Sequence, residues 1–72
     1  MARLTRQQMA EQVTVTCYRQ TETMTRREAL AKYKEGMQCC DPGSSEHERY
    51  ENIYWRLMDG LTKVTDDIDA EY

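Results

Sequence analysis

An apolar stripe in the second half of the chain is the feature that most constrains its fold. Apolar side chains recur there at intervals of three and four residues, which places them on one face of a helix. They are Tyr50, Ile53, Tyr54, Leu57, Met58 and Leu61. Ser45 and Glu48 match a capping box at the start, and Gly60 matches the position just beyond a helix end. The pattern predicts a helix over residues 45–59.

A shorter stripe precedes this helix. It consists of Leu30, Tyr33, Met37 and Cys40, at spacings of three, four and three. Thr25 and Glu28 match a capping box ahead of it. The helix has to end before Pro42, because the residue that precedes a proline avoids the helical region. We therefore predict a second helix over residues 26–39, joined to the first by a short turn in an antiparallel helical hairpin.

Residues 12–19 follow a different period. Val13, Val15 and Cys17 alternate with polar or aromatic side chains, as in a half-buried strand. A lone strand leaves its backbone amides unpaired, so this strand needs a partner. Residues 61–65 are the candidate within the chain. The alternative is a strand from a second copy or from a binding target.

These elements predict a single small domain over residues 1–72, of α+β class but mainly α, with a helical hairpin and one or two short strands. Residues 1–11 are weakly specified, although Thr5 and Gln8 match a capping box for a short helix. Residues 66–72 form an acidic tail that we expect to fray. A chain of 72 residues has a marginal core, so a disulfide, a metal or a partner chain is expected to stabilise it.

The composition narrows the class of protein and its location. No apolar run approaches the roughly 20 residues of a membrane span. The first residues lack the apolar segment of a secretory signal, so the cytoplasm is the expected location. Three cysteines, an odd number, in a reducing compartment argue against a disulfide framework. The cysteines are then inert core thiols, reactive thiols or metal ligands.

Three cysteines and the single histidine make up the ligand set of a common structural zinc site. Cys39 and Cys40 end the first helix of the predicted hairpin, and His47 lies in the first turn of the second. Cys17 joins them if its strand packs beside the turn. The sequence thus predicts a structural zinc ion that supplies folding energy. Adjacent cysteines point about 100° apart on a helix, so a nearby acid or a water is an alternative ligand; the acids are Asp41, Glu46, Glu48 and Glu51.

Charge and exposed side chains indicate a protein partner rather than a substrate. Residues 1–40 hold seven basic and four acidic residues, and residues 41–72 hold three and nine, which gives the net charge of −3. This acidity argues against direct binding to nucleic acid and favours a basic protein surface. Trp55 lies off the apolar stripe, where it either covers a second edge of the core or is exposed as a candidate anchor for a partner. With Glu48, Glu51 and Asp59 it defines a candidate partner-binding face on the second helix.

Catalysis is not expected. A nucleophile paired with a histidine needs an orienting third group and a cleft, and a chain of this length has little room for one. The sequence also lacks a glycine-rich phosphate loop. We therefore expect a binding protein and not an enzyme.

Residues 24–40 (MTRREALAKYKEGMQCC) and 44–54 (SSEHERYENIY) resemble small proteins encoded on phages and conjugative elements of Gram-positive bacteria. Such elements encode anti-CRISPR proteins, which inhibit type II RNA-guided DNA nucleases. The chain is similar in size, acidity and Cys/His content to a zinc-containing member of that group. The resemblance implies a stoichiometric inhibitor, acting in the cytoplasm of the bacterial host, that binds the nuclease and blocks loading of guide or target DNA.

The charge of the target agrees with this interpretation, because such nucleases hold their heteroduplex in a positively charged channel. The alternative is a small non-enzymatic accessory protein of a mobile element that binds nucleic acid or a regulator. A homodimer is compatible with either interpretation.

Overall fold

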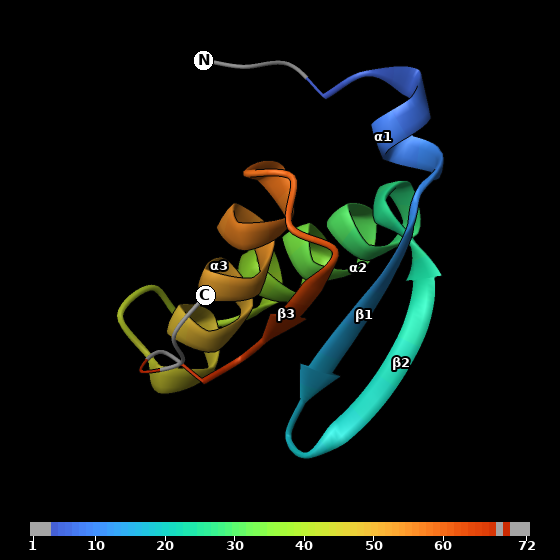
Figure 1. Cartoon of the computed structure of the whole chain (residues 1–72). Coiled ribbons are helices and arrows are strands. Elements are labelled where there is room, and N and C mark those ends of the chain that lie inside the picture. Colours follow the sequence, from blue (N-terminus) through green and yellow to red (C-terminus); the bar gives the residue numbers. More distant parts are fainter. Residues whose placement is uncertain (1–3, 68, 70–72) are drawn as a thin grey trace.

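A computed structural model describes residues 4–67 and 69 of the chain. It is a small α+β structure, about half helical, with three helices and a three-stranded sheet (Figure 1). In chain order the elements are α1 (Arg6–Ala10), β1 (Gln12–Cys17), β2 (Gln20–Thr25), α2 (Arg26–Cys39), α3 (Ser45–Met58) and β3 (Lys63–Thr65).

The sheet has the strand order β2-β1-β3, with β1 in the centre. β1 pairs with β3 in parallel, so that Val15 lies opposite Val64. The prediction that residues 61–65 supply a mate for the first strand is therefore confirmed within the chain. On its other edge β1 pairs with β2 in antiparallel register, with Val15 opposite Glu22.

The strand β2 corrects the prediction of one or two strands. The chain reverses after Cys17 rather than continuing as a strand to residue 19, and Tyr18 and Arg19 form the two-residue turn of a hairpin. Both have positive φ, 52° and 67°. Positive φ at both central residues is the geometry of a type I′ turn, which usually carries Gly, Asn or Asp. The turn lacks all three residue types, so its sequence gave no hairpin signal.

The bounds of α2 agree with the predicted helix, and its start is capped by Thr25, whose hydroxyl accepts from the Glu28 amide. The start of α3 at Ser45 agrees with the predicted helix, but the capping residue is a correction, because Ser44 and not Ser45 is the N-cap. The Ser44 hydroxyl accepts a 3.1 Å hydrogen bond from the His47 amide. Two consecutive serines offered the same capping chemistry, and the turn after Pro42 places the earlier one in the extended cap conformation.

The end of α3 follows the prediction that Gly60 lies just beyond it. Gly60 has φ 91°, a left-handed conformation that costs glycine little. Its amide donates to the Leu57 carbonyl, and the Leu61 amide donates to the Arg56 carbonyl. This pair of bonds is a Schellman motif, and it turns the chain out of α3 toward β3.

The core lies between the sheet and the two long helices, which Figure 1 shows on one side of the sheet. The sheet contributes Val13, Val15 and Val64, and the helices contribute Ala29, Leu30, Tyr33, Ile53 and Leu57. The two helices meet where the Tyr33 and Tyr50 rings lie 5.7 Å apart. Gly36 makes room there, because a Cβ at this position would lie 3.3 Å from the Tyr50 ring.

Both terminal segments contribute residues to the described fold. The capping box between Thr5 and Gln8 is present and starts α1. Asp66, placed by the sequence at the start of a frayed tail, is buried. Its carboxylate accepts hydrogen bonds from the Tyr18 amide and from Arg49. Asp66 is therefore held in the fold, and positions 68 and 70–72 of the predicted tail fall outside the described residues.

A membrane-spanning helix would need a longer apolar run than any helix in the described part of the chain provides.

Candidate protein-binding face

The exposed face of α3 is set by the burial of its opposite face. Ile53 and Leu57 are fully buried against the sheet and α2. Trp55 lies two residues from each, and two residues correspond to about 200° around a helix, so its side chain points away from the core. Its side chain is 51% exposed and packs edge-on against the Tyr54 ring, with 5.4 Å between ring centroids. Trp55 is thus a large apolar group held in place on the surface.

Trp55 lies in a shallow hollow of about 310 Å³ on this face. The lining residues are Glu48, Glu51, Asn52, Trp55, Arg56 and Asp59. All four residues predicted for partner binding are therefore brought together. We call this set the α3 face. Helical spacing explains the grouping, because residues three, four and seven positions apart lie along one side of a helix.

The sequence missed two members of the α3 face, Asn52 and Arg56. The Asn52 amide group donates to the Thr65 carbonyl, 3.2 Å away, and to that of Asp67, 3.4 Å away. It therefore fixes the chain beyond β3 beside the hollow. No pattern in the sequence indicates this contact, because it depends on where β3 lies relative to α3.

The electrostatics of the α3 face are acidic. Three carboxylates and one guanidinium line the hollow. The carboxylates of Glu48 and Asp59 make no hydrogen bond or ion pair with another described residue, and both residues are exposed. Glu51 approaches the Nδ1 atom of His47 at 3.6 Å. An exposed indole ringed by carboxylates is suited to a partner that is basic and also offers an apolar contact.

The predicted zinc ligands belong to three different elements or their ends. Cys39 is exposed, and Cys40 is half-buried at the end of α2, where its thiol donates to Glu46 across 3.8 Å. Burial and the neighbouring Glu46 raise the pKa of the Cys40 thiol. His47 lies on α3 and faces Glu51.

Cys17 lies at the end of β1, beside the rings of Tyr33 and Tyr50. Burial, followed by the charge of Asp66, raises the pKa of its thiol. A raised pKa disfavours the thiolate that a zinc ion binds.

Across residues 4–67 and 69, no group of three or more His, Cys, Asp or Glu side chains is arranged to hold a metal. The arrangement described here therefore does not assemble Cys17, Cys39, Cys40 and His47 into one ligand set. Zinc binding stays a prediction of the sequence.

No protein-family model, curated protein or solved structure matches the chain.

Proposed function

We propose that this protein is a binding module that recognises a basic protein surface through the α3 face, and that its partner is a type II CRISPR nuclease. The observation that carries the first part is the half-exposed Trp55 among carboxylates. The second part rests on the resemblance of residues 24–40 and 44–54 to small proteins of phages and conjugative elements. In this proposal the module acts in the host cytoplasm and blocks guide or target loading.

The proposal assigns different roles to the parts of the α3 face. Trp55 supplies the apolar anchor, because aromatic side chains dominate the energy of protein interfaces. Glu48, Glu51 and Asp59 supply the charge that attracts a basic surface and sets the orientation of docking. The rest of the predicted helical hairpin, α2, serves as the platform that holds α3 in place.

A cleavage assay tests the proposal. Purified protein is added in molar excess to several type II nucleases, each with guide RNA and target DNA. We expect cleavage to stop near one equivalent of protein for at least one nuclease. Undiminished cleavage by all of them would remove the nuclease as the partner.

Variants then test the face itself. Trp55→Ala should weaken inhibition by at least about tenfold, as expected for an interface hot spot. Asp59→Lys should also weaken it, while costing little stability, because a cation suits the C-terminal end of a helix. Glu35→Lys is the matched control, since it makes the same charge change at an exposed position late in α2. Equal inhibition by Trp55→Ala and the unsubstituted protein would rule out the α3 face.

The predicted zinc ion is tested separately from inhibition. Elemental analysis of the purified protein should give about one zinc per chain if Cys17, Cys39, Cys40 and His47 bind it. A chelator should then lower the melting temperature, because binding energy of a structural metal is folding energy. A zinc content well below one equivalent, with no effect of chelator, would remove the metal from the proposal.

A further inference from the structure

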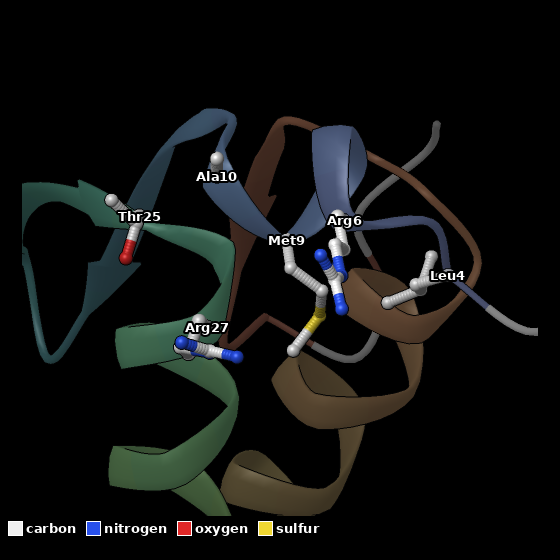
Figure 2. Close-up of a pocket in the computed structure, with 6 residues that line it drawn as sticks. All are labelled: Leu4, Arg6, Met9, Ala10, Thr25 and Arg27. Carbon is white, nitrogen blue, oxygen red and sulfur yellow. The ribbon is translucent and has the colours of Figure 1, made fainter.

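A second hollow lies between α1 and the start of α2, at the opposite end of the sequence from the α3 face. Its volume is about 570 Å³, within the range of small-molecule sites. Figure 2 shows its lining residues, Leu4, Arg6, Met9, Ala10, Thr25 and Arg27. None of them belongs to the α3 face, so this hollow is a separate feature of the molecule.

Two guanidinium groups from different helices share this hollow without a counter-charge. Arg6 belongs to α1 and Arg27 to α2, and Figure 2 shows the Met9 side chain between them. Neither guanidinium group makes a hydrogen bond or ion pair with another described residue. None of the described residues that line the hollow is acidic. Two like charges in one hollow repel each other, and an anion bound between them removes that repulsion.

Two arginines that pack into the fold differ from Arg6 and Arg27, because each has a carboxylate partner. Arg26 is buried and pairs with Glu11, and Arg49 pairs with Asp66 at 3.0 Å. These two structural arginines are thus matched with carboxylates. Arg6 and Arg27 keep all their donors available for a ligand.

We propose that this hollow binds a phosphate monoester that carries an aliphatic carbon portion. A phosphate monoester has a charge near −2 at neutral pH, which matches the two guanidinium groups. Its oxygens accept paired hydrogen bonds from the planar guanidinium fork. Leu4 and Met9, which both pack against the core, form the apolar wall for the carbon portion. The lining residues that the structure describes include no aromatic ring, so they do not offer the stacking that favours nucleobases.

The hydroxyl of Thr25, the remaining polar side-chain group of the hollow, already forms hydrogen bonds with Glu28. The Thr25 hydroxyl accepts from the Glu28 amide and donates to the Glu28 carboxylate at 3.1 Å. Recognition of the anion therefore falls to the two arginines, which makes the proposal testable by single substitutions.

The test is a titration of the full chain followed by NMR, observing the side-chain Nε–Hε signals of Arg6 and Arg27. The probes are n-butyl phosphate, inorganic phosphate, n-pentanoate and a short single-stranded DNA oligonucleotide. We expect saturable shifts at both arginines, with n-butyl phosphate binding more tightly than inorganic phosphate and both more tightly than n-pentanoate. No saturable shift with n-butyl phosphate at millimolar concentration would overturn the proposal. Tighter binding of the oligonucleotide would overturn it as well, because the site would then serve a nucleic-acid backbone.

Substitutions complete the test. Arg6→Gln and Arg27→Gln should each weaken binding of n-butyl phosphate by about tenfold or more, the loss expected for hydrogen bonds to a charged group. Lys34→Gln removes one positive charge from the exposed side of α2 without altering the hollow and should leave binding unchanged. Equal losses in all three variants would show a general charge effect and overturn the proposed site. Trp55→Ala should keep phosphate binding, which separates this inference from the proposed function.

Discussion

The fully buried guanidinium of Arg26 donates a 2.9 Å hydrogen bond to the carbonyl oxygen of Gly60. The same group donates to the carbonyls of Gln8 and Leu61 and forms an ion pair with Glu11. One side chain therefore joins the end of α1, the start of α2 and the turn after α3. Its Nε atom has no partner among the described residues, so the arrangement also carries a cost.

We predict that Arg26→Lys destabilises the protein by about 3 kcal/mol, because one ammonium group cannot replace a guanidinium fork that reaches several fixed acceptors. Urea unfolding followed by circular dichroism measures the change. Arg27→Lys is the matched control at the adjacent, exposed position, and it should change the stability by less than about 0.5 kcal/mol. Equal effects of the two substitutions would contradict a structural role for Arg26.

Gly60 should resist substitution for a backbone reason. Its φ of 91° belongs to the left-handed region, so Gly60→Ala should cost about 1–2 kcal/mol. Gly60→Asn should cost less, because asparagine visits this region more readily. Thermal unfolding of both variants checks the order, and an alanine variant as stable as the asparagine one would contradict this explanation.

Stability should fall at alkaline pH because of Tyr33. Burial raises the pKa of its hydroxyl from 10.0 to about 12. The folded state then binds the phenolic proton more tightly than the unfolded state does, so stability is lost as the pH rises from about 10 to about 12. A shift of this size corresponds to about 3 kcal/mol.

The comparison of Tyr33→Phe with the unsubstituted protein isolates this contribution, because phenylalanine has no proton to lose. The free energy of unfolding in urea is measured between about pH 8 and about pH 11.5, which covers the first part of the titration. It should decline less steeply with pH in the variant. The Cys17 thiol, whose pKa is also raised by burial, remains in both proteins and adds the same slope to each. Identical declines would contradict the prediction.

Asp66 should contribute more to the stability of the fold than its place in an acidic terminal segment indicates. It accepts hydrogen bonds from the Tyr18 amide at 3.1 Å and from Arg49 at 3.0 Å, and so holds the β1–β2 turn against α3. Asp66→Ala should destabilise the protein by about 2 kcal/mol, because the hydrogen bonds that the Tyr18 amide and Arg49 donate to a charged group are both lost. Asp67→Ala removes the neighbouring, exposed carboxylate as a control. A larger loss from Asp67→Ala would contradict the assignment.

Sequence periodicity predicted the elements whose signals are local. The bounds of α2 followed from the Thr25 cap and the break before Pro42, and the end of α3 followed from Gly60. The strand β2 could not be predicted in the same way, because Tyr18 and Arg19 adopt positive φ without a residue type that favours it. A local sequence pattern predicts a helix or strand when the backbone preferences of its residues agree with their pattern of burial.

The same distinction between local and long-range signals applies to the candidate sites. The α3 face was predicted because Trp55 and its acidic neighbours share one helix, so helical spacing alone places them together. The metal set drew on β1, α2 and α3, and its geometry depends on packing that spacing does not describe. The burial of Arg26 was likewise beyond the sequence, since arginine is rarely buried and its acceptors are backbone carbonyls from distant segments.

The parallel pairing of β1 with β3 has a consequence for synthesis on the ribosome. β1 is made early, but its partner strand begins only at Lys63. Until then one edge of β1 has no partner and the Val64 contribution to the core is missing. The nascent chain can form its hairpin and helices from local contacts, yet the closing contact pairs Thr14 with Lys63, far later in the chain. Chains interrupted before Lys63 should therefore be degraded by cellular proteases, while the finished chain is protected.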